Sequence, residues 1–214
     1  MTRGAGAFGV VVLVSGEGTN LQAILDTIHG ADGIEVRGVA SSSAGARALE
    51  RAERAGVPSS VFDVAGHEGR VDRDRALGDW IDEQGGDLVV LAGFMELLSG
   101  EFVRRFEGRV VNVHPALLPS FPGLRAIEQA IEHGVRVTGV TVHFVDEGVD
   151  SGPIILQEAI PLAYARDIEG LEQRLHEVEH RLLPEAIRLI ARGAVSFDPE
   201  NPRRVVIDEP PDAG

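Results

Sequence analysis

Two uninterrupted apolar runs, Phe8–Val14 and Leu88–Ala92, constrain the fold of this chain more than any other feature. A strand with one face in water alternates polar and apolar residues, whereas a strand covered on both faces is apolar throughout. Both runs are far shorter than the roughly 20 residues that a membrane-spanning helix needs. They therefore predict central strands of a parallel sheet that carries helices on both faces.

Helical patterns alternate with apolar runs along most of the chain. Strands are expected over residues 8–14, 34–40, 57–63, 88–92, 110–113, 135–145 and 154–160. Helices are expected over residues 19–29, 44–55, 70–83, 126–133 and 168–192. This alternation predicts a doubly wound α/β fold with a mostly parallel sheet.

We expect one domain over residues 1–198, with an N-terminal half at about 8–105 and a second half at about 106–198. Residues 199–214 are rich in proline and acidic side chains. Such a segment buries little apolar surface, so we expect a loosely ordered tail with an edge strand over residues 204–207.

Composition excludes several kinds of chemistry. The 214 residues include no Cys and no Lys, so all 20 basic side chains are Arg. Thiol nucleophiles, thiolate zinc sites, Schiff-base lysines and a lysine-containing P-loop are therefore excluded. The formal net charge of −14 argues against nucleic acid as the main partner, because contact with its phosphates needs a basic face. The sequence shows neither a signal peptide nor a membrane span, and we expect a cytoplasmic protein.

A glycine loop, residues 15–20, follows the first strand and opens the first helix. It lacks the third glycine of a dinucleotide-binding fingerprint. Two interpretations remain open. The loop is either a tight turn in which Thr19 or Asn20 caps the helix, or a cradle whose backbone N–H groups at Gly18, Thr19 and Asn20 hold a single phosphate.

Asn112 lies in the strand expected over residues 110–113, and His114 follows directly at its carboxyl end. In an extended chain the two side chains project from the same face, because they are two residues apart. An amide donor beside an imidazole suits a developing oxyanion, which the pair would meet with a hydrogen bond and a proton. The competing interpretation is a polar strand end with a satisfied histidine. The acidic loop Asp146–Asp150 is either a surface turn or the source of a carboxylate that reaches His114.

Residues 176–180 satisfy the H-E-x-x-H zinc motif on an expected helix. No histidine follows His180 in the sequence, so a third ligand would have to be a carboxylate. In a helical projection Glu179 lies at the edge of the apolar stripe and His180 nearly opposite it. This projection favours a solvated His180, and we expect no metal.

Several segments together resemble the phosphoribosylglycinamide formyltransferase family, the folate-dependent enzymes of purine synthesis. The resemblance is carried by residues 15–22, 89–95, 112–119, 121–123, 142–145 and 150–153, in the family's order over roughly residues 8–192. The Asn-x-His-Pro motif is shared with other formyl-tetrahydrofolate enzymes, whereas the glycine loop is typical of the glycinamide branch. The resemblance implies a Rossmann-like formyltransferase fold with a phosphate-binding N-terminal half and a folate-binding, catalytic second half.

The family's reaction transfers a formyl group from 10-formyltetrahydrofolate, its co-substrate, to the amine of phosphoribosylglycinamide without a metal. The resemblance implies that Asn112 polarises the formyl carbonyl, that His114 is the acid, and that Asp150 favours protonated His114 and orders a water. The implied substrate contacts are Gly18, Thr19, Asn20, His176 and Glu179.

The resemblance implies that folate contacts Arg70, Met95, Glu96, Leu97, Leu98, Asn112, Asp146, Glu147, Gly148, Val149 and Asp150. Glu96 stands where the family often has a basic residue. Two alternatives stay open, namely a formyltetrahydrofolate hydrolase of the same fold and a non-catalytic module that binds nucleotide phosphate. The expected partners are small molecules rather than nucleic acid or membrane, and the chain is compatible with a monomer or a homodimer.

Overall fold

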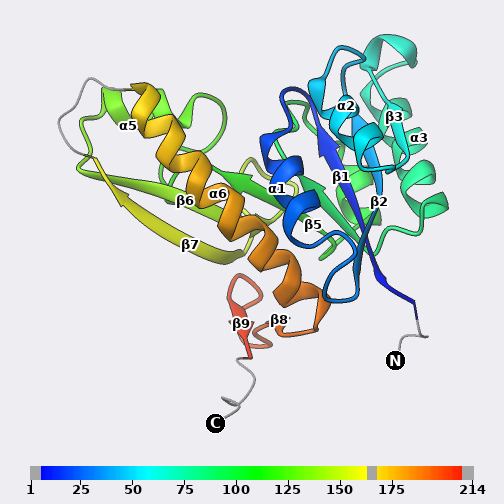
Figure 1. Ribbon diagram of the computed structural model, residues 1–214. Helices are drawn as coiled ribbons and strands as arrows, with labels where there is room; N and C mark the ends of the chain where they lie inside the picture. The colour runs from blue at the N-terminus through cyan, green and yellow to red at the C-terminus, as the bar shows by residue number, and fades with distance from the viewer. Residues whose placement is uncertain (1–5, 163–167, 209–214) are drawn as a thin grey trace. The chain divides into compact units, whose positions relative to one another are not determined.

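A seven-stranded sheet is the centre of the fold in the computed structural model, which describes residues 6–162 and 168–208 (Figure 1). The strands hydrogen-bond in the order β3-β2-β1-β4-β5-β6-β7. Their bounds in chain order are Phe8–Val14, Ile34–Ser41, Ser59–Val61, Leu88–Leu91, Val110–His114, Val137–Phe144 and Ile154–Pro161. Strand β1 pairs in parallel with β2 and β4, β2 pairs in parallel with β3, and β6 and β7 are antiparallel. The predicted α/β fold with a mostly parallel sheet is confirmed.

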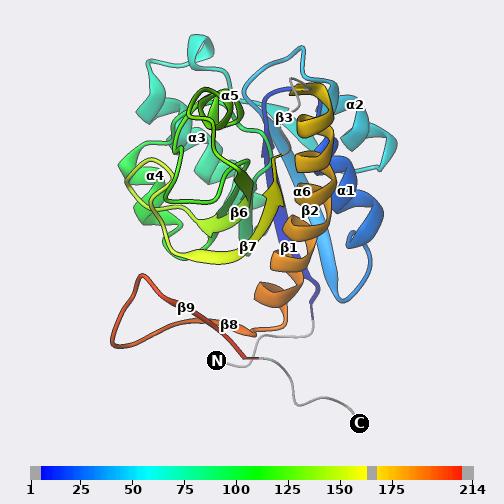
Figure 2. The same cartoon turned by 90° about the vertical axis from the view of Figure 1, so that its left-hand side faces the viewer.

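The chain forms two compact units, of which the first is Met1–Val111. Every residue of β1 and β4 is buried, which explains why both sequences are apolar throughout. In Figure 2, α1 and α2 lie on one side of β1 and β2, and α3 and α4 lie on the other. Right-handed crossovers produce this arrangement, because the chain reverses its direction across the sheet after β3. The helices are α1 (Thr19–Thr27), α2 (Arg47–Arg54), α3 (Arg70–Glu83), α4 (Gly100–Arg105) and the 3₁₀ helix η1 (Val64–Gly66).

The second unit, Asn112–Gly214, is built around the hairpin of β6 and β7. The long helix α6 (Ile168–Ala191) packs on both strands and continues through Pro184 (Figure 1). A shorter helix, α5, spans Ala126–Glu132. Strands β8 (Val195–Phe197) and β9 (Val205–Ile207) pair antiparallel after α6. Among the helices of the described ranges, none is long and apolar enough to cross a membrane.

Sequence analysis missed three short elements, η1, α4 and β8. Helix α4 has six residues, fewer than two turns, so its periodicity gives little signal; the hydroxyl of Ser99 caps it by accepting from the N–H of Phe102. Strand β8 has three residues. Within the expected tail, β9 occupies residues 205–207, and residues 209–214 lie outside the described residues. The expected limits of the domain and of its halves stay predictions.

A buried ion pair in α3 anchors the chain that follows β4. Arg73 is fully buried and Asp74 nearly so, and the Arg73 Nε donates to Asp74 Oδ1. The Arg73 Nη2 donates to the carbonyl of Leu97 at 3.2 Å, and the guanidinium lies 5.6 Å from the ring centre of Phe94. The other carboxylate oxygen of Asp74 accepts from the N–H of Ser99. The pair therefore fixes the backbone of the segment after β4 at Leu97 and Ser99.

We expect Asp74→Ala to lower the free energy of unfolding by about 3–5 kcal/mol, because the change leaves the buried charge of Arg73 uncompensated. Urea unfolding of the purified protein measures this quantity. Asp79→Ala is the matched control, since it removes an exposed partner of Arg105 and should cost less than about 1 kcal/mol. Equal losses of unfolding free energy in the two variants would show that the buried pair does not anchor the segment after β4.

Candidate active site

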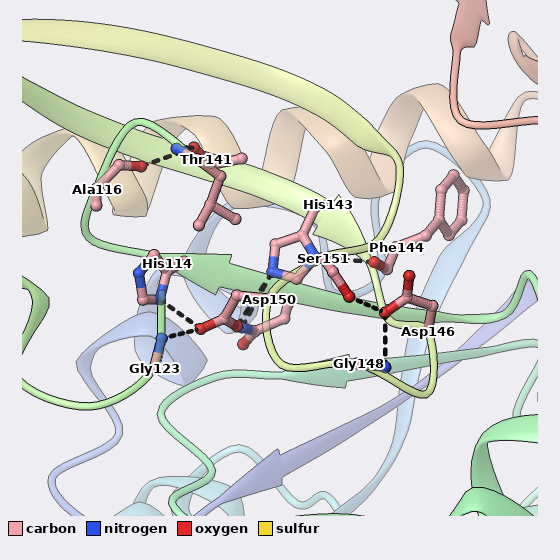
Figure 3. Close-up of polar contacts among 12 residues, drawn as sticks. His114, Ala116, Gly123, Thr141, His143, Phe144, Asp146, Gly148, Asp150 and Ser151 are labelled. Atoms are coloured by element: carbon pink, nitrogen blue, oxygen red, sulfur yellow. Dashed lines mark hydrogen bonds and ion pairs between the residues drawn. The ribbon is translucent and has the colours of Figure 1, made fainter. Parts of the chain in front are cut away.

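Asn112, His114 and Asp150 come together in the second unit. Asn112 and His114 lie on one face of β5, and Asp150 lies in the loop between β6 and β7. The Asp150 Oδ2 is 3.3 Å from the Nδ1 of His114 (Figure 3). The Asp150 Oδ1 accepts from the amide of Asn112 at 3.3 Å. His114 is buried and Asn112 is half-buried. The structure thus assembles the three residues that sequence analysis assigned to catalysis.

The ring of His114 is oriented by two partners. One ring nitrogen, Nδ1, faces the carboxylate of Asp150, and the other, Nε2, lies 2.8 Å from the carbonyl oxygen of Phe121. Both ring nitrogens thus face oxygen acceptors, and these two contacts hold the ring in one orientation.

Asp150 is held as an anion by its neighbours. Burial acts to raise the pKa of this carboxyl, but it is outweighed by the polar contact with the ring of His143 and the hydrogen bond from the N–H of Gly123, together with the charges of His114 and His143. The net result lowers the pKa of Asp150 to about 2. Its backbone has φ of 49°, in the left-handed region that is unfavourable for a side-chain-bearing residue. Asp150 is thus fixed in charge and in position.

His143 belongs to the same network, and sequence analysis gave it no role. It is 1% exposed on β6, and its Nδ1 donates to the carbonyl of Phe144 at 2.8 Å. Its Nε2 then faces the amide nitrogen of Asn112 at 3.3 Å and the Oδ1 of Asp150 at 3.6 Å. One signal was present, since a histidine inside a continuous apolar run must find buried hydrogen-bond partners.

The rest of the acidic loop has a structural part and an exposed part. The Oδ1 of Asp146 accepts from the N–H of Gly148 and from the hydroxyl of Ser151 (Figure 3). A Cβ on Gly148 would lie 2.0 Å from the Ser151 Oγ, so a larger residue there would force the serine hydroxyl away from Asp146. Glu147 and Val149 are exposed. Asp146 shapes the loop, while Glu147–Val149 present the surface that the resemblance assigned to folate.

The glycine loop of the first unit leads directly into helix α1. Gly18 is the N-cap of α1 with φ of 72°, and a Cβ there would lie 2.6 Å from that of Ala48. Thr19 is half-buried and Asn20 is 8% exposed. Arg51 lies against the loop, where its Nε donates to the carbonyl of Glu17 at 2.8 Å. Gly18 is thus required by both its backbone angle and the space around it.

The segment Met95–Leu98, which follows β4, is anchored by its backbone. The N–H of Met95 donates to the hydroxyl of Ser15 at 2.8 Å, and the Ser15 Oγ is 2.7 Å from that of Ser42. The side chains of Met95 and Leu97 are 68% and 61% exposed, and Glu96 is exposed. Arg70, at the start of α3, is exposed as well. The segment thus combines a fixed backbone with outward-facing side chains.

Helix α6 carries the residues of the zinc-like motif and the predicted substrate contacts. His176 is exposed and Glu179 is 6% exposed, so Glu179 is buried more deeply than its place at the edge of the apolar stripe indicated. His180 is half-buried rather than solvated, and its Nε2 has no hydrogen-bond partner in the described part of the chain. Burial and the charge of His176, whose ring stacks on it at 6.1 Å, lower the pKa of His180. Packing of α6 against its neighbours therefore reaches further around the helix than the stripe indicated.

A shallow hollow of about 390 Å³ lies on the same helix, lined by Glu172, Gln173, His176, Glu177 and His180. Within residues 6–162 and 168–208, no three His, Asp or Glu side chains are placed to hold a metal ion. The expectation that the reaction needs no metal stays a prediction.

Comparison with known proteins places these features in a family context. A profile described as formyl transferase matches residues 9–187. The trifunctional purine biosynthetic protein adenosine-3 of Gallus gallus is 46% identical over 187 residues, which are 87% of this chain and 19% of that protein. This chain therefore spans about a fifth of the length of that relative.

Two further matches extend over most of both chains. The phosphoribosylglycinamide formyltransferase of Escherichia coli strain K12 is 41% identical over 192 residues, which are 88% of this chain and 89% of that protein. The crystal structure of glycinamide ribonucleotide transformylase 1 from Symbiobacterium toebii has a TM-score of 0.91 and 47% identity. It covers 96% of this chain, and this chain covers 96% of it.

The low pKa of Asp150 predicts how stability depends on pH. The folded pKa, about 2, lies below the ordinary value of 3.8, so the ionised form stabilises the fold above the ordinary value and this stabilisation is lost as the pH falls through the folded value. The pH-dependent part of the stability difference between wild type and Asp150→Asn should shrink from about 2 kcal/mol near pH 5 to about 1 kcal/mol near pH 3. Urea unfolding across this range measures it, and a difference independent of pH would contradict the assignment.

Proposed function

This chain belongs to the formyl transferase family, and we propose that it transfers the formyl group of 10-formyltetrahydrofolate to the amine of phosphoribosylglycinamide. The products are formylglycinamide ribonucleotide and tetrahydrofolate, in the synthesis of purines. The observation that carries the proposal is the gathering of Asn112, His114 and Asp150 around one buried carboxylate. Support comes also from a relative named for this activity that matches most of the chain.

The amine of the substrate attacks the formyl carbon, and negative charge develops on the formyl oxygen. The bond between the formyl carbon and N10 of the folate then breaks, and N10 leaves with a proton that balances the one lost by the attacking amine. Donors already in place where charge develops stabilise such a transition state, because they need no reorganisation. Asn112 offers an amide N–H and His114 an imidazolium N–H. The Nε2 of His114 is occupied by the carbonyl of Phe121 in this structure, so binding of the substrate must replace that acceptor by the formyl oxygen before the reaction begins.

Asp150 acts through its charge. With a pKa of about 2 it remains ionised at neutral pH, which makes it a poor proton donor. It instead stabilises protonated His114 and orders a water that carries protons from the attacking amine. His143 is a positioning residue in this scheme, because its Nε2 faces both the amide of Asn112 and the carboxylate of Asp150.

The two substrates are held by different chemistry. The backbone of Gly18, Thr19 and Asn20 holds the phosphate at the N-terminus of α1, where the helix dipole favours negative charge. His176 and Glu179 of α6 approach the glycinamide end. The folate is bound by Arg70, by the segment Met95–Leu98, and by the loop Asp146–Asp150.

No metal takes part in this scheme, since the transfer uses only the donors and the carboxylate described above. The partners are therefore the two small-molecule substrates. A cytoplasmic location and a monomeric or homodimeric state are further parts of the proposal.

Removing either end of the network should abolish most of the activity. We expect Asn112→Ala to lower kcat by about 100- to 1000-fold, the cost of losing one oxyanion donor. Asp150→Asn should lower it by about 100-fold or more, because His114 loses the anion that favours its protonated form. A spectroscopic assay with both substrates measures the rates. Full activity in both variants, or none in the wild type, would defeat the enzymatic proposal.

The glycine loop separates this proposal from a hydrolase of the same fold. Gly18→Ala forces an unfavourable φ and a clash with Ala48, so the KM for the ribonucleotide should rise about tenfold or more while the KM for the formyl folate is unchanged. Gly16→Ala is the matched control, because its Cβ would meet no atom within 4 Å. A hydrolase would release formate without the ribonucleotide and would be insensitive to both changes.

A further inference from the structure

The C-terminal hairpin, residues 195–207, is an ordered element. Strands β8 and β9 pair from Val195 to Ile207, and the turn between them is closed by the N–H of Asp198 on the carbonyl of Arg204. The Arg204 guanidinium also donates to the carboxylate of Asp198 at 2.9 Å. A three-residue strand pair is marginal by itself, so its contacts with the rest of the second unit decide its position.

One such contact reaches the strand that carries His143. The ring of Phe197, in β8, lies 4.9 Å from the ring of Phe144 at an angle of 44°. Phe144 directly follows His143, and its carbonyl accepts the Nδ1 proton of that histidine (Figure 3). The hairpin therefore packs on the residue whose backbone orients the ring of His143.

A second contact reaches the loop that carries Asp150. The Nη2 of Arg203 donates to the carbonyl of Ser151 at 2.8 Å, one residue after Asp150. Arg204 forms a parallel β-bridge with Ile154, three residues further on. The hairpin thus touches the chain immediately after each of two network residues, His143 and Asp150.

The loop needs such support. Asp150 adopts a left-handed backbone that is unfavourable for most residues with a side chain, and such strain persists only where neighbouring structure holds it. Two residues on, Gly152 approaches Phe144 so closely that a Cβ would lie 1.9 Å from the Phe144 carbonyl oxygen. A shift of Phe144 or Ser151 would therefore directly change this close contact between Gly152 and the Phe144 carbonyl.

We propose that the C-terminal hairpin positions the Asp150 loop for catalysis, with Arg203 and Phe197 as its positioning residues. Neither side chain needs to touch substrate for this role. The expected effect on the reaction rate rests on the proposed function, whereas the expected effect on hydrogen exchange in the loop does not. The hydrogen bond from Arg203 fixes Ser151, the residue after Asp150, and so limits the orientations in which the Asp150 carboxylate can approach His114.

The test compares Arg203→Met with Arg203→Lys and with Arg192→Met, which removes an exposed charge at the end of α6. We expect Arg203→Met to lower kcat/KM for the formyl folate about 3- to 10-fold, as loss of one hydrogen bond implies, with the KM for the ribonucleotide unchanged. Amide hydrogen exchange should quicken over residues 146–152 and stay unchanged in α3. Lysine, which keeps a donor, should restore most of the activity, and Arg192→Met should behave as wild type.

Phe197→Ala provides an independent arm, since it removes the ring contact and leaves the Arg203 donor intact. It too should quicken exchange over residues 146–152 without changing the KM for the ribonucleotide. Unchanged kinetics in Arg203→Met, or losses accompanied by a lower melting temperature and faster exchange throughout the chain, would overturn the proposal. If the wild type transfers no formyl group, the proposed function fails, and the exchange measurement alone then decides whether the hairpin holds the loop.

Discussion

The half-buried carboxylate of Asp150 contacts the imidazole of His114, the amide of Asn112 and the backbone N–H of Gly123. These contacts organise the geometry of the site in the second unit. The hydrogen bond of Asp150 to Gly123 fixes the chain after β5, and its contact with Asn112 fixes the end of that strand. Burial alone would raise the pKa of this carboxyl, and the groups around it lower the pKa to about 2. Charge and geometry therefore depend on each other.

An acidic chain that binds anions needs local rather than overall positive potential. The net charge is −14 and no lysine is present. Partial charges at the N-terminus of α1, together with the guanidinium of Arg51 beside the carbonyl of Glu17, create such a local region at the glycine loop. The net negative charge thus argues against polyanions, which require an extended basic face. It does not argue against the binding of a single phosphate group at the glycine loop.

Sequence reasoning succeeded where residues act locally and was incomplete where partners are distant. The bounds of β1 and α3 follow directly from apolar runs and helical periodicity. Asn112 and His114 share a face because strand geometry requires it, but nothing in their spacing shows that Asp150 lies beside them. Its approach depends on how β6 and β7 pair, which is long-range information. The burial of Glu179 and the role of His143 were missed for the same reason.

The backbone anchoring of Met95–Leu98 separates the shape of this segment from its surface chemistry. Ser15 holds the N–H of Met95 and Arg73 holds the carbonyl of Leu97, so both anchors of the segment come from residues outside it. A side-chain substitution at positions 95–97 changes an exposed surface and leaves these two hydrogen bonds in place. A substitution of Ser15 or Arg73 instead removes an anchor and changes the path of a segment to which neither residue belongs.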